Sequence, residues 1–128
     1  MAEQSLDRIL YLEDGWTREL TKKFIEGLGY QVDLVTNIQD AELALAQNRY
    51  HAAVLDNSVP NIPFGPEITN AGLSLAYRML KYPNHPLRIA LATNSSFQSW
   101  QLKDMESVGI TYISKSDMIE MFKEFLKK

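Results

Sequence analysis

The chain has no cysteine among its 128 residues. It therefore forms no disulfide, and it offers neither a thiol nucleophile nor a cysteine-based zinc site. It also lacks an apolar run long enough to span a membrane, and its first residues, MAEQSLDR, have no signal-peptide core. We therefore expect a cytoplasmic protein that does not associate with membranes.

Clustered positive charge is also scarce. The formal net charge is −3, and no cluster of Lys or Arg stands out except the closing Lys127-Lys128. A chain of this charge has no general affinity for the phosphates of nucleic acids or for anionic lipid surfaces. Direct binding to nucleic acid is accordingly not expected.

The chain does contain short apolar runs that alternate with segments of helical periodicity. ILYL, AAVL and IALA are continuous rather than alternating, as in parallel strands that are covered on both faces. The five predicted strands are Ile9–Leu12, Val32–Val35, Ala52–Leu55, Ile89–Ala92 and Ile110–Ile113. Alternation with five helices predicts an α/β fold with a parallel sheet and helices on both faces, built as one domain from residues 1–128.

Helix boundaries follow from capping residues and breakers. The first helix contains Leu20, Phe24, Ile25 and Leu28 and stops at Gly29, and the second is capped by Asn37 and buries Ala41, Ala44 and Leu45. The third is expected from about Asn70 to Lys81. Ser95 or Ser96 is expected to cap the fourth, with apolar members Phe97, Trp100, Met105 and Val108. Ser116 or Asp117 is expected to cap the fifth, which buries Ile119, Phe122 and Leu126.

Charged and hydroxyl side chains follow the ends of four predicted strands. The first strand is followed by Glu13 and Asp14, the third by Asp56, the fourth ends at Thr93, and Lys115 follows the fifth. Parallel strands bring their carboxyl ends to one edge of the sheet, where ligands bind. Each residue alone is more simply explained as a cap or a surface group, but all of those explanations must hold together.

Three carboxylates at one edge repel each other and favour a bound cation. With oxygen ligands and no histidine or cysteine nearby, Mg²⁺ is preferred to zinc. With Mg²⁺ and Lys115 the formal charges sum to zero. Asp56 could then act as a nucleophile that forms an acyl phosphate, and Thr93 could donate a hydrogen bond to the phosphoryl oxygens.

From about Arg8 to Leu126 the sequence resembles the receiver domains of two-component response regulators, which have a flavodoxin-like fold with strand order 2-1-3-4-5. The fragments that carry the resemblance are LYLED, AAVLDNSVP, IALATNS and TYISKS. The resemblance implies that Asp56 is the phosphoacceptor and that Glu13, Asp14, Asp56 and the Ser58 carbonyl hold Mg²⁺. It also implies that Thr93 and Lys115 bind the phosphoryl group and that Tyr112 is the aromatic switch residue.

The same resemblance implies a role in phosphorelay signalling rather than enzymatic action on an external substrate. The phosphoryl donor would be a histidine kinase or phosphotransfer protein, and the output an altered surface that binds another protein, with homodimer formation left open. The surface is expected on Phe97–Val108 and Met118–Leu126. Because no output domain follows in the sequence, the chain is expected to act through a partner or as an excised domain.

Three departures from the family pattern keep a second interpretation open. An insertion, roughly residues 61–70, separates Asp56 from Gly72, and it is either a tolerated surface loop or a lid over the site. Asn94 and Ser116 replace the small residue and the proline that the family prefers. Because a cis bond is costly for a non-proline residue, we expect either a trans bond or a strained one at Ser116. The alternative is a degenerate receiver, a scaffold that is not phosphorylated.

Other residues that could carry chemistry fit the sequence less well. A phosphatase with an aspartate nucleophile commonly has a second aspartate two residues later, where this chain has Ser58. Trp16 is next to the predicted metal site, but an exposed residue on the first helix is an equally good description. His51 and His85 lie away from the predicted edge, and we interpret both as structural.

Overall fold

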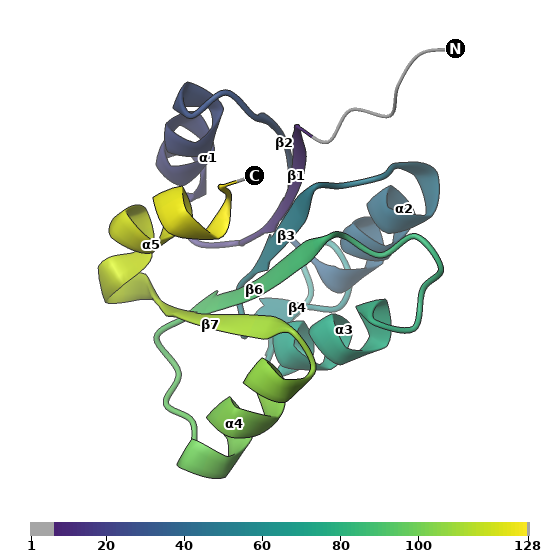
Figure 1. Ribbon diagram of the computed structural model, residues 1–128. Coiled ribbons are helices and arrows are strands. Elements are labelled where there is room, and N and C mark those ends of the chain that lie inside the picture. The colour runs from purple at the N-terminus through teal and green to yellow at the C-terminus, as the bar shows by residue number, and fades with distance from the viewer. Residues whose placement is uncertain (1–6, 128) are drawn as a thin grey trace.

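Residues 7–127 are described by the computed structural model of the chain. A parallel sheet of five strands forms the centre, in the order β2-β1-β3-β6-β7 (Figure 1). The strands are β1 (Arg8–Leu12), β2 (Gln31–Val35), β3 (Ala52–Leu55), β6 (Arg88–Thr93) and β7 (Ile110–Ser114). The predicted order 2-1-3-4-5 is confirmed, since the labels β4 and β5 belong to a separate two-stranded ribbon.

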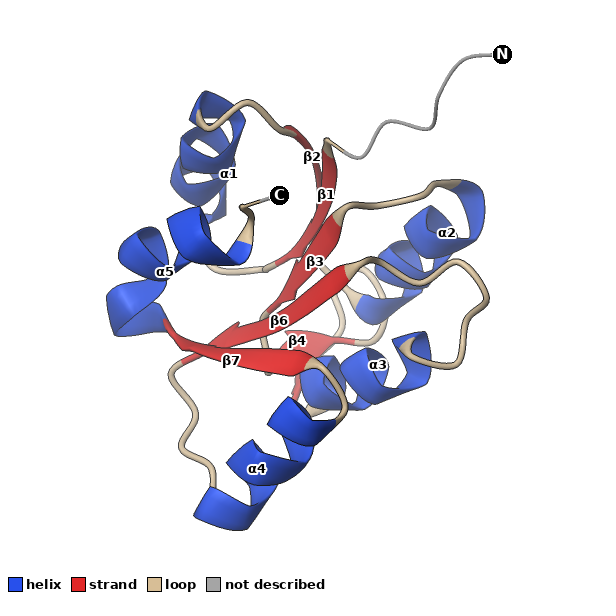
Figure 2. Ribbon diagram, in the orientation of Figure 1, coloured by secondary structure: helices blue, strands red, loops and turns tan. Residues whose placement is uncertain are grey.

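Helices cover both faces of the sheet, as predicted. Figure 2 shows α1 and α5 on one side and α2, α3 and α4 on the other. Their bounds are α1 (Arg18–Gly27), α2 (Ile38–Gln47), α3 (Ala71–Met79), α4 (Ser99–Ser107) and α5 (Met118–Phe125). Two apolar clusters result, one on each face of the sheet, which explains why the inner strands are apolar without alternation.

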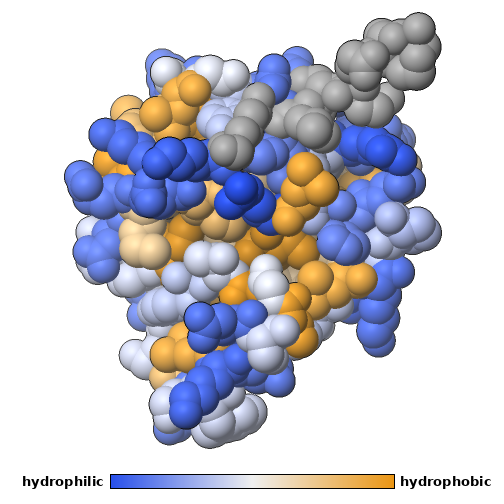
Figure 3. Space-filling view, in the orientation of Figure 1, coloured by the Kyte–Doolittle hydropathy of each residue, from blue (hydrophilic) through white to orange (hydrophobic). Residues whose placement is uncertain are grey.

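The burial of the strands decreases from the centre of the sheet to its edges. All four residues of β3 are buried, whereas only Val32 is buried in the edge strand β2. The sheet is therefore shielded in the middle, where β1, β3 and β6 pair in register. On the face shown in Figure 3, hydrophilic residues surround separate apolar patches, as expected for amphipathic helices on a buried sheet.

The second helix begins as predicted, but the fourth does not. The Asn37 side chain accepts a hydrogen bond from the Asp40 amide, which caps α2. In α4 the cap is Gln98, whose amide donates to the Gln101 side chain, and the helix starts at Ser99. The prediction that Ser95 or Ser96 caps this helix was therefore wrong. The Ser95 hydroxyl instead accepts a hydrogen bond from the Thr93 hydroxyl.

Several residues assigned to buried helix faces lie on the surface. Leu20 is 67% exposed, Trp100 69% and Ile119 44%, so their prediction as core members was wrong. Leu28 and Val108, at the helix ends, are also exposed. In each helix, other apolar residues occupy the side that packs on the sheet, and the exposed ones lie outside that side. The buried residues include Ile25, Met105, Phe122 and Leu126.

A short 3-10 turn (η1, Lys115–Asp117) connects β7 to α5. Asp117 occupies the position before α5, as predicted, but its side chain makes no capping hydrogen bond. Residues 7–127 contain no cis peptide bond, so the bond at Ser116 is trans, as its non-proline character favours.

The insertion after β3 forms a small ribbon of two antiparallel strands. These are β4 (Val59–Pro60) and β5 (Glu67–Ile68), and the tip between them contains Phe64 in a left-handed conformation, with φ 63°. The Gln39 amide at the start of α2 donates to the Asn61 carbonyl. The ribbon is therefore fixed against α2 and is not a helix, in agreement with its proline content.

Candidate functional site

Three carboxylates meet at the carboxyl edge of the sheet. Glu13 and Asp14 follow β1 and Asp56 follows β3, and each side chain has an oxygen within 4.8 Å of the others. The Glu13 amide donates a hydrogen bond to the Val35 carbonyl, and the Asp56 amide donates one to the Leu12 carbonyl. The backbone of both acids therefore continues the hydrogen bonding of the sheet. The prediction that these acids lie together is confirmed by this geometry.

Lys115 is the cation that faces this cluster. Its Nζ lies 2.8 Å from Glu13 Oε1 and 3.2 Å from Asp56 Oδ2. Both carboxylates are largely buried, with Glu13 3% and Asp56 8% exposed. One ammonium against three carboxylates leaves a formal excess of two negative charges in a place with little solvent to screen it.

Burial and the neighbouring charges together change the proton affinity of Asp56. Burial, and then the charge of Glu13, raises the pKa of Asp56 to about 7, although Lys115 acts in the opposite direction. Burial lowers the pKa of Lys115, but its bonds to Glu13 and Asp56 outweigh this effect and raise it. A second cation next to the carboxylates would favour the ionised form of Asp56 and so lower its pKa.

The backbone of α3 packs so closely on the Asp56 carbonyl that there is no room for a side chain at Gly72. A Cβ atom at Gly72 would lie 1.8 Å from the Asp56 carbonyl oxygen, and the Gly72 amide donates to the Asn57 carbonyl at 2.9 Å. Helix α3 thus approaches the carboxyl end of β3 as closely as a glycine permits. This contact explains why a glycine follows the insertion.

Thr93 and Tyr112 are both bonded to the loop after β6. Thr93 is 3% exposed, and its hydroxyl donates to Ser95 Oγ and accepts from the Ser95 amide. The Tyr112 hydroxyl donates to the Ser95 carbonyl at 3.3 Å, and its ring packs edge-on against Phe97. Their predicted roles in a switch stay predictions, but Ser95 connects the two.

Sequence reasoning did not single out Asn57, which is fully buried beside Asp56. Its amide donates to Asp56 Oδ1 at 2.8 Å, and its side chain bonds to Asn70, Leu73 and Ser95. A polar residue directly after a buried strand end was the one available indication. Ser58, the next residue, is half-buried, and its carbonyl stays a predicted metal ligand.

The insertion lies beside the acidic cluster. Pro60, Phe64 and Gly65 line a hollow together with Asp14, Arg18 and Thr36. Arg18 donates to the Asp14 and Gly15 carbonyls, which fixes the loop between β1 and α1. The Phe64 side chain itself is fully exposed, so it does not cover the carboxylates.

The remaining aromatic and imidazole candidates lie outside the cluster. Trp16 is 86% exposed in the loop before α1. His51 is buried at the start of β3, where it stacks on Tyr30 and its Nε2 lies 3.0 Å from the Leu126 carbonyl. His85 bonds to the neighbouring Pro86 carbonyl. Both histidines make structural contacts, as predicted.

Comparisons with known proteins agree on the fold. No family model and no curated protein matches the chain. Among solved structures, a CheY-like receiver domain from Methanospirillum hungatei is 23% identical, covering 95% of this chain and 94% of its own, with a TM-score of 0.72. The receiver domain of a histidine kinase from Syntrophus aciditrophicus is 22% identical, with a TM-score of 0.73 and coverages of 94% and 86%.

A third matching structure was determined with a metal. The response regulator TrrA from Thermotoga maritima, in complex with Mg²⁺ and beryllium fluoride, is 26% identical and covers 94% of this chain and 99% of its own, with a TM-score of 0.69. The chain thus has the fold of CheY-like response regulator receiver domains, and the resemblance predicted from sequence is confirmed at the level of fold. No helix within residues 7–127 has both the length and the apolar character needed to cross a membrane.

Proposed function

We propose that the chain is a receiver module of two-component signalling that accepts a phosphoryl group on Asp56. The observation that carries the proposal is the cluster of Glu13, Asp14 and Asp56, with Lys115 in contact with two of them. Paired like charges that are buried at a strand edge destabilise the fold unless they bind something positive. A binding site for a cation explains why the fold tolerates this loss of stability, since the cluster itself does not stabilise the fold.

The donor set fits Mg²⁺. All three side chains supply carboxylate oxygens, they lie close enough to share one ion, and they exceed the charge of Lys115 by two. Glu13, Asp14 and Asp56 would hold the ion, with the Ser58 carbonyl as a further ligand. When bound, Mg²⁺ supplies charge stabilisation for phosphoryl oxygens and keeps Asp56 ionised.

The protein residues then have separate tasks in phosphoryl transfer. A carboxylate oxygen of Asp56 attacks the phosphorus of the donor, and the bond from phosphorus to the donor breaks, with its electron pair leaving on the donor. The Asn57 amide holds Asp56 Oδ1, which orients the carboxylate for attack through Oδ2. Lys115 contacts Oδ2 and is placed to balance the phosphoryl charge.

Signalling requires that the phosphoryl group change the protein surface. The Thr93 hydroxyl would turn from Ser95 toward the phosphoryl oxygens, and Tyr112 would move inward, which changes the face of α4, β7 and α5. The donor would be a histidine kinase or a phosphotransfer protein, and the receiver would act in the cytoplasm on a protein partner. The rival proposal is a degenerate receiver, which would bind its partner without phosphorylation.

The test is the intact mass after incubation with acetyl phosphate and Mg²⁺, beside the variant Asp56→Asn. We expect one added phosphoryl group that requires Mg²⁺ and is absent from the variant. Absence of the adduct from the wild type, with Mg²⁺ binding measured separately, would favour the scaffold. An adduct that persists in Asp56→Asn would place the phosphoacceptor elsewhere.

A further inference from the structure

The side chain of Asn57 joins three segments that are distant in the sequence. Its Nδ2 donates to Asn70 Oδ1 at 2.9 Å and to Ser95 Oγ at 3.4 Å, and its Oδ1 accepts from the Leu73 amide at 3.2 Å. Asn70 ends the insertion, Leu73 is in the first turn of α3, and Ser95 follows β6. Both hydrogens of the amide group and its oxygen are thus engaged.

Burial makes the loss of any of these hydrogen bonds costly. Asn57 is 0% exposed, so no water replaces a bond that is lost, and an unpaired amide at this position is costly. Asn70 is held in a left-handed conformation, with φ 65°, immediately before α3. The end of the insertion therefore supplies one of the bonds that hold the Asn57 side chain in its orientation toward Ser95.

Ser95 in turn determines the orientation of Thr93. Ser95 Oγ receives hydrogen bonds from both Thr93 Oγ1, at 3.2 Å, and Asn57 Nδ2. Thr93 can donate to another group only when it gives up Ser95 Oγ. Since Asn57 fixes this acceptor, it stabilises the orientation of Thr93 that is turned away from a group on Asp56.

We propose that Asn57 is a positioning residue that couples the inserted ribbon to the Thr93 hydroxyl. A change at the ribbon, such as the contact of a phosphodonor protein, passes through Asn70 and Asn57 to Ser95 and thereby sets how readily Thr93 assists the reaction at Asp56. The regulatory part of this inference rests on the proposed phosphorylation of Asp56. The structural link does not.

Two single variants and their combination test the coupling. Asn70→Gly removes the acceptor at the ribbon and keeps the left-handed backbone without strain, and Ser95→Ala removes the acceptor that holds Thr93. In each variant the rate of phosphorylation of the full chain by acetyl phosphate should increase about two- to tenfold. This factor corresponds to the net free energy of one neutral hydrogen bond. The double variant should be no faster than the faster single variant, because both act through Asn57.

Matched controls are available in the same segments. Asn61→Ala changes an exposed amide of the insertion, and Ser96→Ala removes a hydroxyl from the loop after β6; both should leave the rate unchanged. Independent effects that multiply in the double variant would overturn the coupling, and so would an unchanged rate in Asn70→Gly.

A second measurement keeps the coupling testable if no phosphorylation occurs. In the ¹⁵N-labelled chain without phosphodonor, Asn70→Gly should shift the amide signals of Thr93 and Ser95, and Asn61→Ala should not. Unmoved signals would overturn the inference even if Asp56 is phosphorylated. Shifted signals with no phosphoryl adduct in the wild type would refute the proposed function and retain the link.

Discussion

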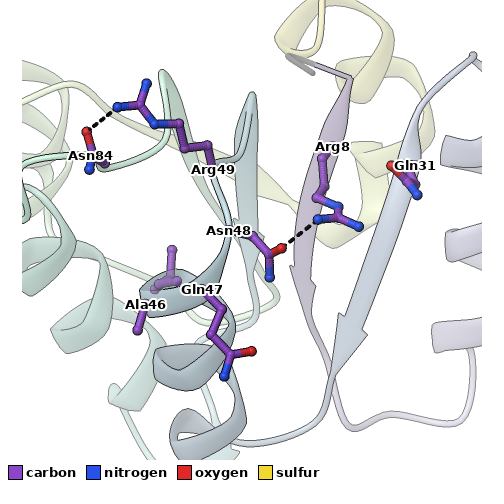
Figure 4. A pocket seen from close by; sticks show the side chains of 8 residues that line it. Arg8, Gln31, Ala46, Gln47, Asn48, Arg49 and Asn84 are labelled. Carbon is purple, nitrogen blue, oxygen red and sulfur yellow. Dashed lines mark hydrogen bonds between the residues drawn. The ribbon is translucent and has the colours of Figure 1, made fainter. Parts of the chain in front are cut away.

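The two edges of the sheet both contain buried or half-buried carboxylates, but at only one edge is the carboxylate matched by a cation. At the amino edge, Arg8 pairs with Asp33, and Asp33 also accepts a hydrogen bond from Tyr50 at 2.7 Å. Figure 4 shows Arg8 and Arg49 at a hollow on this edge, each with a hydrogen bond to an asparagine. The carboxylate of Asp33 is thus matched by Arg8, while Arg49 is exposed and bonds to a neutral side chain.

At the carboxyl edge the three carboxylates face one ammonium. The amino edge has therefore the electrostatics of a structural network, whereas the carboxyl edge keeps a charge that the fold does not neutralise. Perturbed ionisation is characteristic of functional sites, and at Asp56 burial, and then the charge of Glu13, raises the pKa. Three of the predictions below, on Mg²⁺, on the Asp→Asn substitutions and on pH, test whether the imbalance is the property that separates the two edges.

The largest effect is expected where the backbone is closest to Asp56. Gly72→Ala would place a Cβ 1.8 Å from the Asp56 carbonyl oxygen, so α3 must move away from β3. We expect a loss of about 3 kcal/mol or more in the free energy of unfolding, measured by urea denaturation. Gly27→Ala is the control, because its Cβ would meet nothing within 4 Å and should stabilise α1 slightly.

Mg²⁺ should stabilise the carboxyl edge and leave the amino edge unchanged. At one hundred times the dissociation constant a ligand specific for the folded state adds about 2.7 kcal/mol to the free energy of unfolding. This gain should be greatly reduced in Asp14→Asn, which removes one of the three carboxylates. Asp33→Asn should keep the gain. An equal response of both variants to Mg²⁺ would mean that the ion binds the surface generally.

The same substitution should have opposite signs at the two edges when no divalent ion is present. Asp56→Asn removes one charge of the excess and should raise the free energy of unfolding above pH 7 by about 1–3 kcal/mol. Asp33→Asn removes the partner of Arg8 and should lower it by about 1 kcal/mol. Urea denaturation in EDTA measures both, and destabilisation by Asp56→Asn would contradict the proposed strain.

The pH dependence of stability tests the predicted gain in the free energy of unfolding of Asp56→Asn. Because the pKa of Asp56 is raised from its ordinary value of 3.8 to about 7, the folded state binds a proton that the unfolded state releases. The stabilising effect is complete below the unfolded pKa and is lost as the pH rises through about 7. The difference between wild type and Asp56→Asn should therefore grow from about pH 4 to pH 7 and then remain constant.

Some of this contrast was predictable from sequence and some was not. Glu13, Asp14, Asp56 and Lys115 were found because continuous apolar runs locate strand ends, and parallel strands bring those ends together. Which of several serines caps a helix depends on competing hydrogen bonds, so the role of Ser95 was not predictable. Asn57 was missed because its partners come from three separate segments. The exposure of Trp100 depended on how α4 rotates against the sheet.

The smallest effect is expected at the tip of the insertion. Phe64 is fully exposed and has φ 63°, a conformation that costs about 1 kcal/mol for a residue with a side chain. Phe64→Gly removes this strain and no buried area, so the free energy of unfolding should rise by up to about 1 kcal/mol, or stay constant if the added chain entropy offsets the gain. A loss above 1 kcal/mol in urea denaturation would mean that the ring packs on the protein. An aromatic side chain that contributes nothing to stability, next to the hollow that Asp14 lines, is better explained by contact with a partner than by packing.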